Sequence, residues 1–303
     1  DVLGLTIPAR EGVTLRGEQL LLFPTLERIA FHPDNLTADA YAALARLPRL
    51  AHVSLRGSGG GDPSPIPDAL KEVLPLCRAI QTVQLERARV GDEVLAVLAQ
   101  LPNLQDVSLN AVSTLTEQGL AVLGALPNLK ALSFGHETGF ERFPFSPEQT
   151  RLESLSFEDT RFSDDTFAAL PVQPNLKYIN LEDSEELGPE GWKALGRQTS
   201  VETLNACGTE IDGEGLAGLA GMTGLKSLSL MSNFGLTDND LAEMPGFESL
   251  THLNLARCRG ITDDGVIELV GRLPNLKEVD VSRSGCTAEL KNRLPKVVSL
   301  IAR

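Results

Sequence analysis

Three apolar residues recur along the chain with a fixed spacing, and each copy is followed by a polar turn and a stretch of helical periodicity. We number positions within a copy from 0 at the first apolar residue, so that Leu250, Leu253 and Leu255 occupy positions 0, 3 and 5. Positions 3 and 5 are two residues apart, which is the period of a β-strand and places both side chains on one face. Neither half can bury its apolar side alone, so each copy predicts a strand and a helix packed together.

The triplet occurs thirteen times, and most copies begin 23 to 26 residues after the previous one. The exceptions are an interval of 30 residues after Leu50 and one of 21 residues after Leu276. A period of this length over the whole chain is typical of a solenoid. The triplets begin at Val2, Leu26, Leu50, Ile80, Leu104, Leu129, Leu152, Leu176, Val201, Leu225, Leu250, Leu276 and Val297.

Residues that favour a helix N-cap stand before most of the helical stretches. Each stretch then ends near a Leu-Pro or Met-Pro step, because proline disfavours helix in the residue before it. Residues 1–25 have the weakest pattern, with a helix expected only over Glu18–Phe23. The expected N-caps are Thr37, Thr116, Ser163, Asp212, Thr237 and Thr262.

The fullest copy, residues 250–274, reads LTHLNLARCRGITDDGVIELVGRLP. Its LxxLxL core, the following cysteine and the I-T-D-x-G-V segment resemble the leucine-rich-repeat family, in particular its ribonuclease-inhibitor-like, cysteine-containing subclass and bacterial arrays. The copies that begin at Leu104, Val201 and Leu225 are similar. The resemblance implies an α/β leucine-rich-repeat solenoid, a horseshoe of about 12–13 repeats with a parallel concave sheet and convex helices. It also implies a single domain over residues 1–303 that serves as a binding scaffold without catalysis.

Two segments depart from the repeat. Residues 56–68 are rich in glycine, proline and serine, and we interpret them as a flexible loop or a lip that contacts a partner. Residues 136–150 lack a helical period, and their phenylalanines are expected either to fill the core in place of a helix or to form an exposed hot spot. These phenylalanines are Phe140, Phe143 and Phe145.

Composition limits the classes of partner. The chain has 303 residues, of which 42% are hydrophobic and 22% charged, and its net charge is −14. Nucleic acids and anionic membranes need a cationic footprint, so we expect neither as a partner. No apolar run is long enough to cross a membrane. The array also begins and ends within strand patterns without a capping motif, so we expect either that the ends pack against something or that flanking segments exist.

On the predicted concave face, positions 2, 4 and 6 point outward because side chains alternate along a strand. Position 4 is mostly small and polar, as in Ser108, Asn205 and Asn254. This track is expected to be either the hydrated floor of a curved sheet or a hydrogen-bonding surface for a partner.

The N-terminal repeats place basic side chains on this face. Arg56 is expected beside Glu86 of the next repeat, where a cross-strand ion pair would account for both residues. The other basic residues predict a site for an acidic partner. The candidate binding residues here are Arg28, His32, His52, Arg56, Glu86 and Asp106.

The central repeats reverse the sign of the charge. Adjacent repeats carry Glu158-Asp159 and Glu182-Asp183, and such stacked carboxylates repel one another unless they are solvated or neutralised. A hydrated acidic rim and a docking site for Lys or Arg of a partner both fit the pattern. A Ca²⁺ site is the third alternative, although the loop spacing of such a site does not occur here. Tyr178 lies beside this cluster and is expected to act as an aromatic anchor or as filler.

No catalytic constellation is found in the sequence. The four histidines are dispersed, and no nucleophile elbow, zinc-type helix or phosphate loop is present. The four cysteines have no metal-type spacing and are interpreted as structural, with the exception of Cys207, which is expected to be exposed at position 6. We therefore expect no enzyme activity, no cofactor and no bound metal.

We expect a monomeric scaffold that binds a protein through its concave face and rim. The alternative is the targeting or substrate-recognition part of a bacterial effector or ubiquitin-ligase-type enzyme whose catalytic segment lies outside this chain. The absence of a disulfide framework favours a cytoplasmic location or secretion into a host cytosol.

Overall fold

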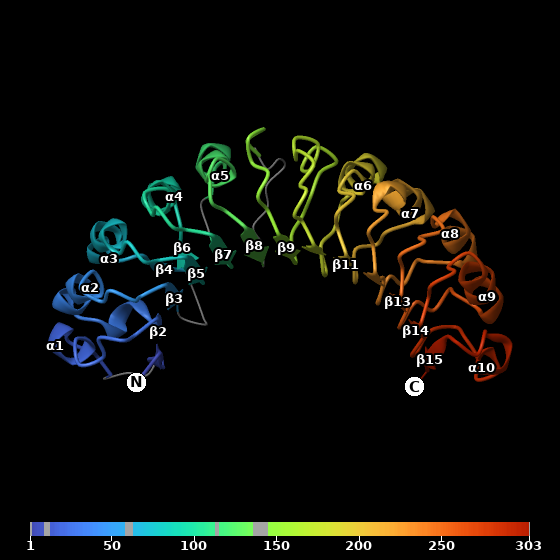
Figure 1. Cartoon of the computed structure of the whole chain (residues 1–303), viewed down its shortest axis with the longest axis horizontal. Helices are drawn as coiled ribbons and strands as arrows, with labels where there is room; N and C mark the ends of the chain where they lie inside the picture. Colours follow the sequence, from blue (N-terminus) through green and yellow to red (C-terminus); the bar gives the residue numbers. More distant parts are fainter. Residues whose placement is uncertain (1, 9–12, 58–62, 113–114, 136–144, 303) are drawn as a thin grey trace. The chain divides into compact units, whose positions relative to one another are not determined.

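The computed structural model describes residues 2–8, 13–57, 63–112, 115–135 and 145–302. The chain forms two compact units, Asp1–Thr138 and Gly139–Arg303. In each unit the strands lie side by side on one face and the helices cover the other (Figure 1). We call the face of each sheet that is turned away from the helices the open face.

The first unit contains a parallel sheet in which each strand pairs with the strand of the next repeat, without a shift in register. Its strands are β1 (Gly4–Thr6), β2 (Arg28–Phe31), β3 (His52–Arg56), β5 (Thr82–Glu86), β7 (Asp106–Asn110) and β8 (Ala131–Gly135). Its helices are α1 (Gly17–Leu20), α2 (Ala38–Leu44), α3 (Asp68–Val73), α4 (Asp92–Leu98) and α5 (Glu117–Gly124), with the 3₁₀ turns η1 (Pro33–Asn35) and η2 (Leu74–Leu76).

The second unit repeats this arrangement with shorter strands. The sheet comprises β9 (Ser154–Glu158), β10 (Tyr178–Asn180), β11 (Thr203–Asn205), β12 (Ser227–Ser229), β13 (His252–Asn254), β14 (Glu278–Asp280) and β15 (Ser299–Ile301), all parallel. The helices are α6 (Pro189–Gly196), α7 (Gly213–Gly218), α8 (Asp238–Glu243), α9 (Asp263–Gly271) and α10 (Leu290–Arg293), with the 3₁₀ turn η3 (Leu219–Gly221).

The apolar triplets form the core between sheet and helices. In the repeat that begins at Leu250, the side chains of Leu250, Leu253 and Leu255 are all buried. Trp192 on α6 is also fully buried and packs in the core. The predicted α/β solenoid, with one strand for each triplet, is therefore confirmed.

The helix starts follow the predicted N-caps with one exception. Thr116 and Asp212 cap α5 and α7 by accepting hydrogen bonds from backbone N–H groups three residues on. The helix predicted after Ser163 is wrong, because residues 164–169 form turns. Phe162 and Phe167 pack there edge-on against Phe157 of β9, with ring centroids 5.5 Å apart in both pairs. These aromatic rings supply the apolar volume that a helix supplies in other repeats.

The two irregular segments are described in part. Within 56–68, Ser64–Pro65 forms a short strand, β4, which pairs in parallel with β6 (Ala88–Arg89). Within 136–150, Phe145 is buried, which agrees with the expected core-filling role. Phe140 and Phe143 lie outside the described residues.

Most strands lead into a turn that starts from the same backbone conformation. Position 7 adopts positive φ in most repeats, for example φ 51° at Asp159, 62° at Gly208 and 65° at Arg257. Its N–H donates to the carbonyl at position 6 of the next repeat, as from Asp183 to Cys207 over 2.8 Å. The turns of neighbouring repeats are thereby joined by a backbone ladder that continues the sheet.

Candidate interaction surfaces

Four polar residues at position 4 of the second unit bond to their own turns. The side-chain oxygens of Asn180, Asn205 and Asn254 accept from the N–H two residues on, over 3.1, 3.2 and 2.9 Å. Asp280 makes the same contact with Ser282 over 2.8 Å. Each of these side chains thus bonds to the backbone at the point where the strand passes into its turn. This track of polar side chains is therefore built into the fold of the second unit.

Tyr178 stands on the open face of β10 as a partly exposed aromatic residue, with 38% of its surface accessible. Burial raises the pKa of its hydroxyl, and the negative charges of Glu182 and Glu158 raise it further. The hydroxyl therefore stays protonated at neutral pH and offers a hydrogen-bond donor and an acceptor beside two carboxylates.

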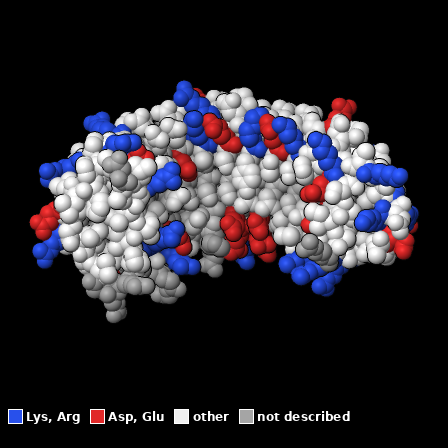
Figure 2. All heavy atoms as spheres, turned by 60° about the horizontal axis from the view of Figure 1, so that its bottom comes forward, with Lys and Arg blue, Asp and Glu red and all other residues white. Residues whose placement is uncertain are grey.

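The carboxylates around Tyr178 come from two adjacent repeats. Glu158 ends β9 and is exposed, while Glu182 is half-buried and accepts from the Asn205 amide over 3.1 Å. Asp159 and Asp183 follow at position 7 with φ of 51° and 54°, and the Asp159 N–H donates to the Glu182 carbonyl over 2.9 Å. We call Glu158, Asp159, Glu182 and Asp183 the acidic cluster. Figure 2 shows acidic side chains gathered on this part of the molecule.

In the first unit, position 2 carries a row of polar residues across neighbouring strands. Arg28, His52, Thr82 and Asp106 are successive register partners on β2, β3, β5 and β7. Burial and then the charge of Arg28 lower the pKa of His52, while Asp106 opposes them. Burial raises the pKa of Asp106 and His52 lowers it. His52 therefore interacts electrostatically with Arg28 on one side and with Asp106 on the other.

The expected pair between Arg56 and Glu86 is confirmed. The two residues are register partners, and the Arg56 Nε lies 3.5 Å from the Glu86 Oε2. Arg87 also approaches Glu86, at 3.9 Å, so two guanidinium groups share one carboxylate. The group of Arg56, Arg87 and Glu86 therefore carries a net positive charge.

His32 differs from the expectation that it faces a partner. Its side chain is buried, and its Nδ1 accepts from the Asp34 N–H over 3.2 Å at the start of η1. Since β2 ends at Phe31, the alternation of a strand no longer applies at residue 32. His32 caps the 3₁₀ turn and is not part of the accessible basic surface.

Cys207 is also less accessible than its position suggests. It is buried, with its Sγ 3.0 Å from the Ser229 Oγ, because β11 ends two residues before it. Burial raises the pKa of its thiol. Burial also raises the pKa of Cys258 to about 11, and its Sγ donates to the Leu230 carbonyl. Both thiols thus have a structural role.

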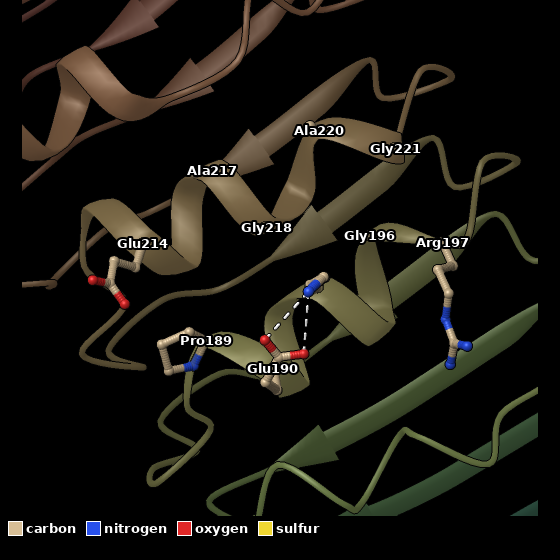
Figure 3. Close-up of a pocket in the computed structure, with 10 residues that line it drawn as sticks. Pro189, Glu190, Gly196, Arg197, Glu214, Ala217, Gly218, Ala220 and Gly221 are labelled. Carbon is tan, nitrogen blue, oxygen red and sulfur yellow. Dashed lines mark hydrogen bonds and ion pairs between the residues drawn. The ribbon is translucent and has the colours of Figure 1, made fainter.

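A groove of about 510 Å³ lies on the helical side of the second unit, between α6 and the segment formed by α7 and η3 (Figure 3). Small residues line it, and Lys193 pairs with Glu190 at 3.3 Å. A Cβ on Gly196 would lie 2.0 Å from the Gly218 carbonyl oxygen, so the two segments pack too closely for larger side chains. The shape of the groove follows from helix packing.

Two further features of the structure concern metal binding and membranes. Among the described residues, no group of three or more His, Cys, Asp or Glu side chains is arranged to hold a metal ion. None of the described helices is long and apolar enough to span a membrane.

Several exposed residues of the second unit escaped the sequence reasoning. They follow the strands at positions 7 and 9, outside the alternation of positions 2, 4 and 6. Comparing equal positions of successive repeats would have found them, because their charge changes sign along the array. These residues are Glu210, Phe234, Arg257, Arg259 and Arg283.

Comparison with known proteins agrees with this architecture. Residues 248–270 match the family model described as Leucine Rich repeat. A chain in the crystal structure of the Rad7 and Elc1 complex in yeast matches with a TM-score of 0.56 and 16% sequence identity, over 92% of this chain and 75% of that one. No curated protein matches the sequence. Residues 248–270 thus match a leucine-rich repeat, and the fold of the chain is similar to that of the solved repeat structure.

Proposed function

We propose that this leucine-rich-repeat protein binds a basic segment of a protein partner on the open face of its second unit. The observation that carries the proposal is the position of Tyr178, which is partly exposed between the charges of Glu158 and Glu182. Aromatic residues surrounded by charge are typical hot spots of protein interfaces. A lysine or arginine of the partner would pack on the ring and neutralise the repelling carboxylates.

The rigidity of the site supports binding to a preformed surface. The backbone ladder fixes the turns that hold the acidic cluster, and the side-chain bonds of Asn180 and Asn205 fix the strand ends. A surface that is ordered before binding loses little conformational entropy in the complex. Leucine-rich-repeat proteins generally serve as protein-interaction scaffolds, and the matching chain comes from a complex of two proteins.

The first unit offers a second contact of opposite sign. Arg28 is exposed, and Arg56 and Arg87 share a single carboxylate. We propose that this surface binds an acidic segment of the same partner. Replacing Arg28 and Arg56 by glutamate would then weaken the complex, and an unchanged affinity would exclude this second contact.

The binding site on the second unit can be tested by placing a photo-crosslinking amino acid at position 178 of the full chain. In cells of the source organism, irradiation should join the chain to one protein of defined mass, and Glu158→Lys with Glu182→Lys should abolish the product. The matched control places the same crosslinker at Val172, which is 53% exposed in the same unit. Equal products at 172 and 178, or a product that survives both lysine substitutions, would contradict the proposal.

A further inference from the structure

The turns that follow β10–β14 form a continuous row along one side of the second unit, which we call the loop edge. Successive N–H groups at position 7 donate to the next repeat, from Gly208 to Met231 and from Ser232 to Ala256 over 2.9 Å and from Arg257 to Ser282 over 2.8 Å. The side chains at positions 7 and 9 therefore project from a fixed backbone, and neighbouring repeats are spaced by about 4.8 Å.

The exposed side chains of the loop edge change from acidic to basic along the row. Asp183 and Glu185 follow β10, and Glu210 follows β11. Phe234 follows β12 with 63% of its surface exposed. Arg257 and Arg259 follow β13, and Arg283 follows β14. Figure 2 shows acidic side chains near the centre of the view and basic side chains to their right, over this unit.

The basic end of this row is not neutralised within the unit. Among the described residues, Arg257, Arg259 and Arg283 make no ion pair with a carboxylate. Other arginines of the same unit are used internally, as where Arg293 pairs with Asp264 at 2.6 Å and Arg272 donates to three backbone carbonyls. The three arginines of the loop edge thus stay available to an external partner.

The row runs from acidic through aromatic to basic side chains. A second copy turned by a two-fold axis therefore presents a complementary row to the first. An axis that passes through the turn after β12 reverses the row, so the turn after β11 faces the turn after β13 of a second copy. Glu210 then meets Arg259, both at position 9, and Asp183 meets Arg283, both at position 7. Phe234 meets its own symmetry mate. A two-fold interface requires this kind of self-complementary patch.

We propose that the second unit associates with a second copy of this chain through the loop edge, as an antiparallel two-fold dimer. The proposal departs from the monomer expected from the sequence. The dimer is weak, because the contacting row spans only a few turns and each copy carries a net charge of −14. Of the residues placed in the partner site, only Asp183 also lies in this dimer contact, while Tyr178, Glu158 and Glu182 do not.

Sedimentation equilibrium of the full chain over a wide concentration range tests the proposal. Glu210→Arg alone and Arg259→Glu alone each place like charges in two symmetry-related contacts, and each should weaken self-association by at least about tenfold. An equimolar mixture of the two single variants should form a heterodimer, because each substituted side chain then faces an opposite charge. Glu248→Arg, an exposed charge change of the same unit outside the loop edge, should leave self-association unchanged.

The mixture of the Glu210→Arg and Arg259→Glu chains distinguishes direct pairing of residues 210 and 259 from a general effect of charge and from a loss of folding. A wild-type chain that is monomeric at every concentration would overturn the proposal. Self-association that is unaffected by the changes at 210 and 259, or a mixture that stays monomeric, would also overturn it. Neither result bears on the site at Tyr178, whose crosslinking is measured separately.

Discussion

Single polar side chains at position 8 join neighbouring repeats inside the second unit. The Asn233 amide donates to the carbonyls of Ala206 and Leu230 over 2.8 and 2.9 Å. The Ser184 hydroxyl donates to the Phe157 carbonyl over 2.7 Å, and Cys258 occupies the same position one repeat after Asn233. All three side chains are buried, so each satisfies backbone oxygens that water does not reach. This requirement explains why position 8 takes small hydrogen-bonding residues.

Asn233→Ala is expected to lower the free energy of unfolding by roughly 1–3 kcal/mol, because two buried carbonyls lose a donor. Urea unfolding followed by circular dichroism would measure the change. Asn239→Ala, at an exposed position of α8, is the matched control and should change stability by no more than about 0.5 kcal/mol. Equal effects of the two substitutions would show that Asn233 does not hold the repeats together.

His52 reports on the polar row of the first unit. Its pKa lies below the ordinary value because of burial and Arg28, and Asp106 acts in the opposite direction. Arg28→Ala should therefore raise the pKa of His52, and Asp106→Asn should lower it. Titration of the imidazole resonances by NMR would measure both shifts, with His252 on the exposed face of β13 as an internal reference. Shifts of the same sign in both variants would contradict the described electrostatics.

At the scale of elements, successive helices are connected at their N-terminal ends. Asp92 in the first turn of α4 accepts from the Thr116 hydroxyl over 2.7 Å, and Asp238 of α8 accepts from Thr262 over 2.6 Å. Asp263 of α9 accepts from the N–H and hydroxyl of Thr287 over 2.8 and 2.6 Å. In each case the carboxylate of one repeat accepts hydrogen bonds from groups at the start of the next repeat's helical segment. They link repeats on the helical side of each unit, as the β-ladder does on the other side.

The bond between Asp263 and Thr287 makes stability depend on acid pH. Hydrogen bonds from the Thr287 side chain and backbone lower the pKa of Asp263. A lowered folded-state pKa contributes stability that is present above the ordinary value of about 3.9 and is lost as pH falls through the folded pKa. Thr287→Val should therefore be less stable than the wild type near neutral pH, and this difference should shrink as the pH falls below about 4.

Thermal unfolding at a series of pH values would measure that difference. Thr223→Val, at an exposed site of the same unit, provides the control and should show no such convergence with the wild type. A gap between wild type and Thr287→Val that is constant over the whole acid range would contradict the role given to this bond.

For the whole molecule, the sequence predicts the repeat, the parallel strands and most helix starts. The triplets suffice for this because burial of positions 0, 3 and 5 follows directly from their spacing, as at Leu250, Leu253 and Leu255. The accessible face is predicted less well. Alternation holds only while the strand lasts, so it fails for His32 and Cys207, which lie beyond the ends of β2 and β11. The helix expected after Ser163 fails because Phe162 and Phe167 fill the core instead.

The candidate surfaces were found from sequence where the strand is long or the side chain large. Arg56 and Glu86 pair as expected because β3 and β5 extend to position 6. Tyr178 is exposed because it stands at the first residue of β10. The loop edge was missed because its positions lie in turns with positive φ, where the direction of a side chain depends on backbone geometry that strand periodicity does not describe.

The central claim is that Tyr178 and the acidic cluster bind a basic segment of a protein partner. The most direct test is the dissociation constant of the crosslinked partner, once identified, measured by calorimetry with the purified full chain. Tyr178→Ala and the pair Glu158→Gln with Glu182→Gln should each weaken binding by at least about tenfold, while Glu248→Gln should leave it unchanged. A dissociation constant that stays the same in both site variants would contradict the claim.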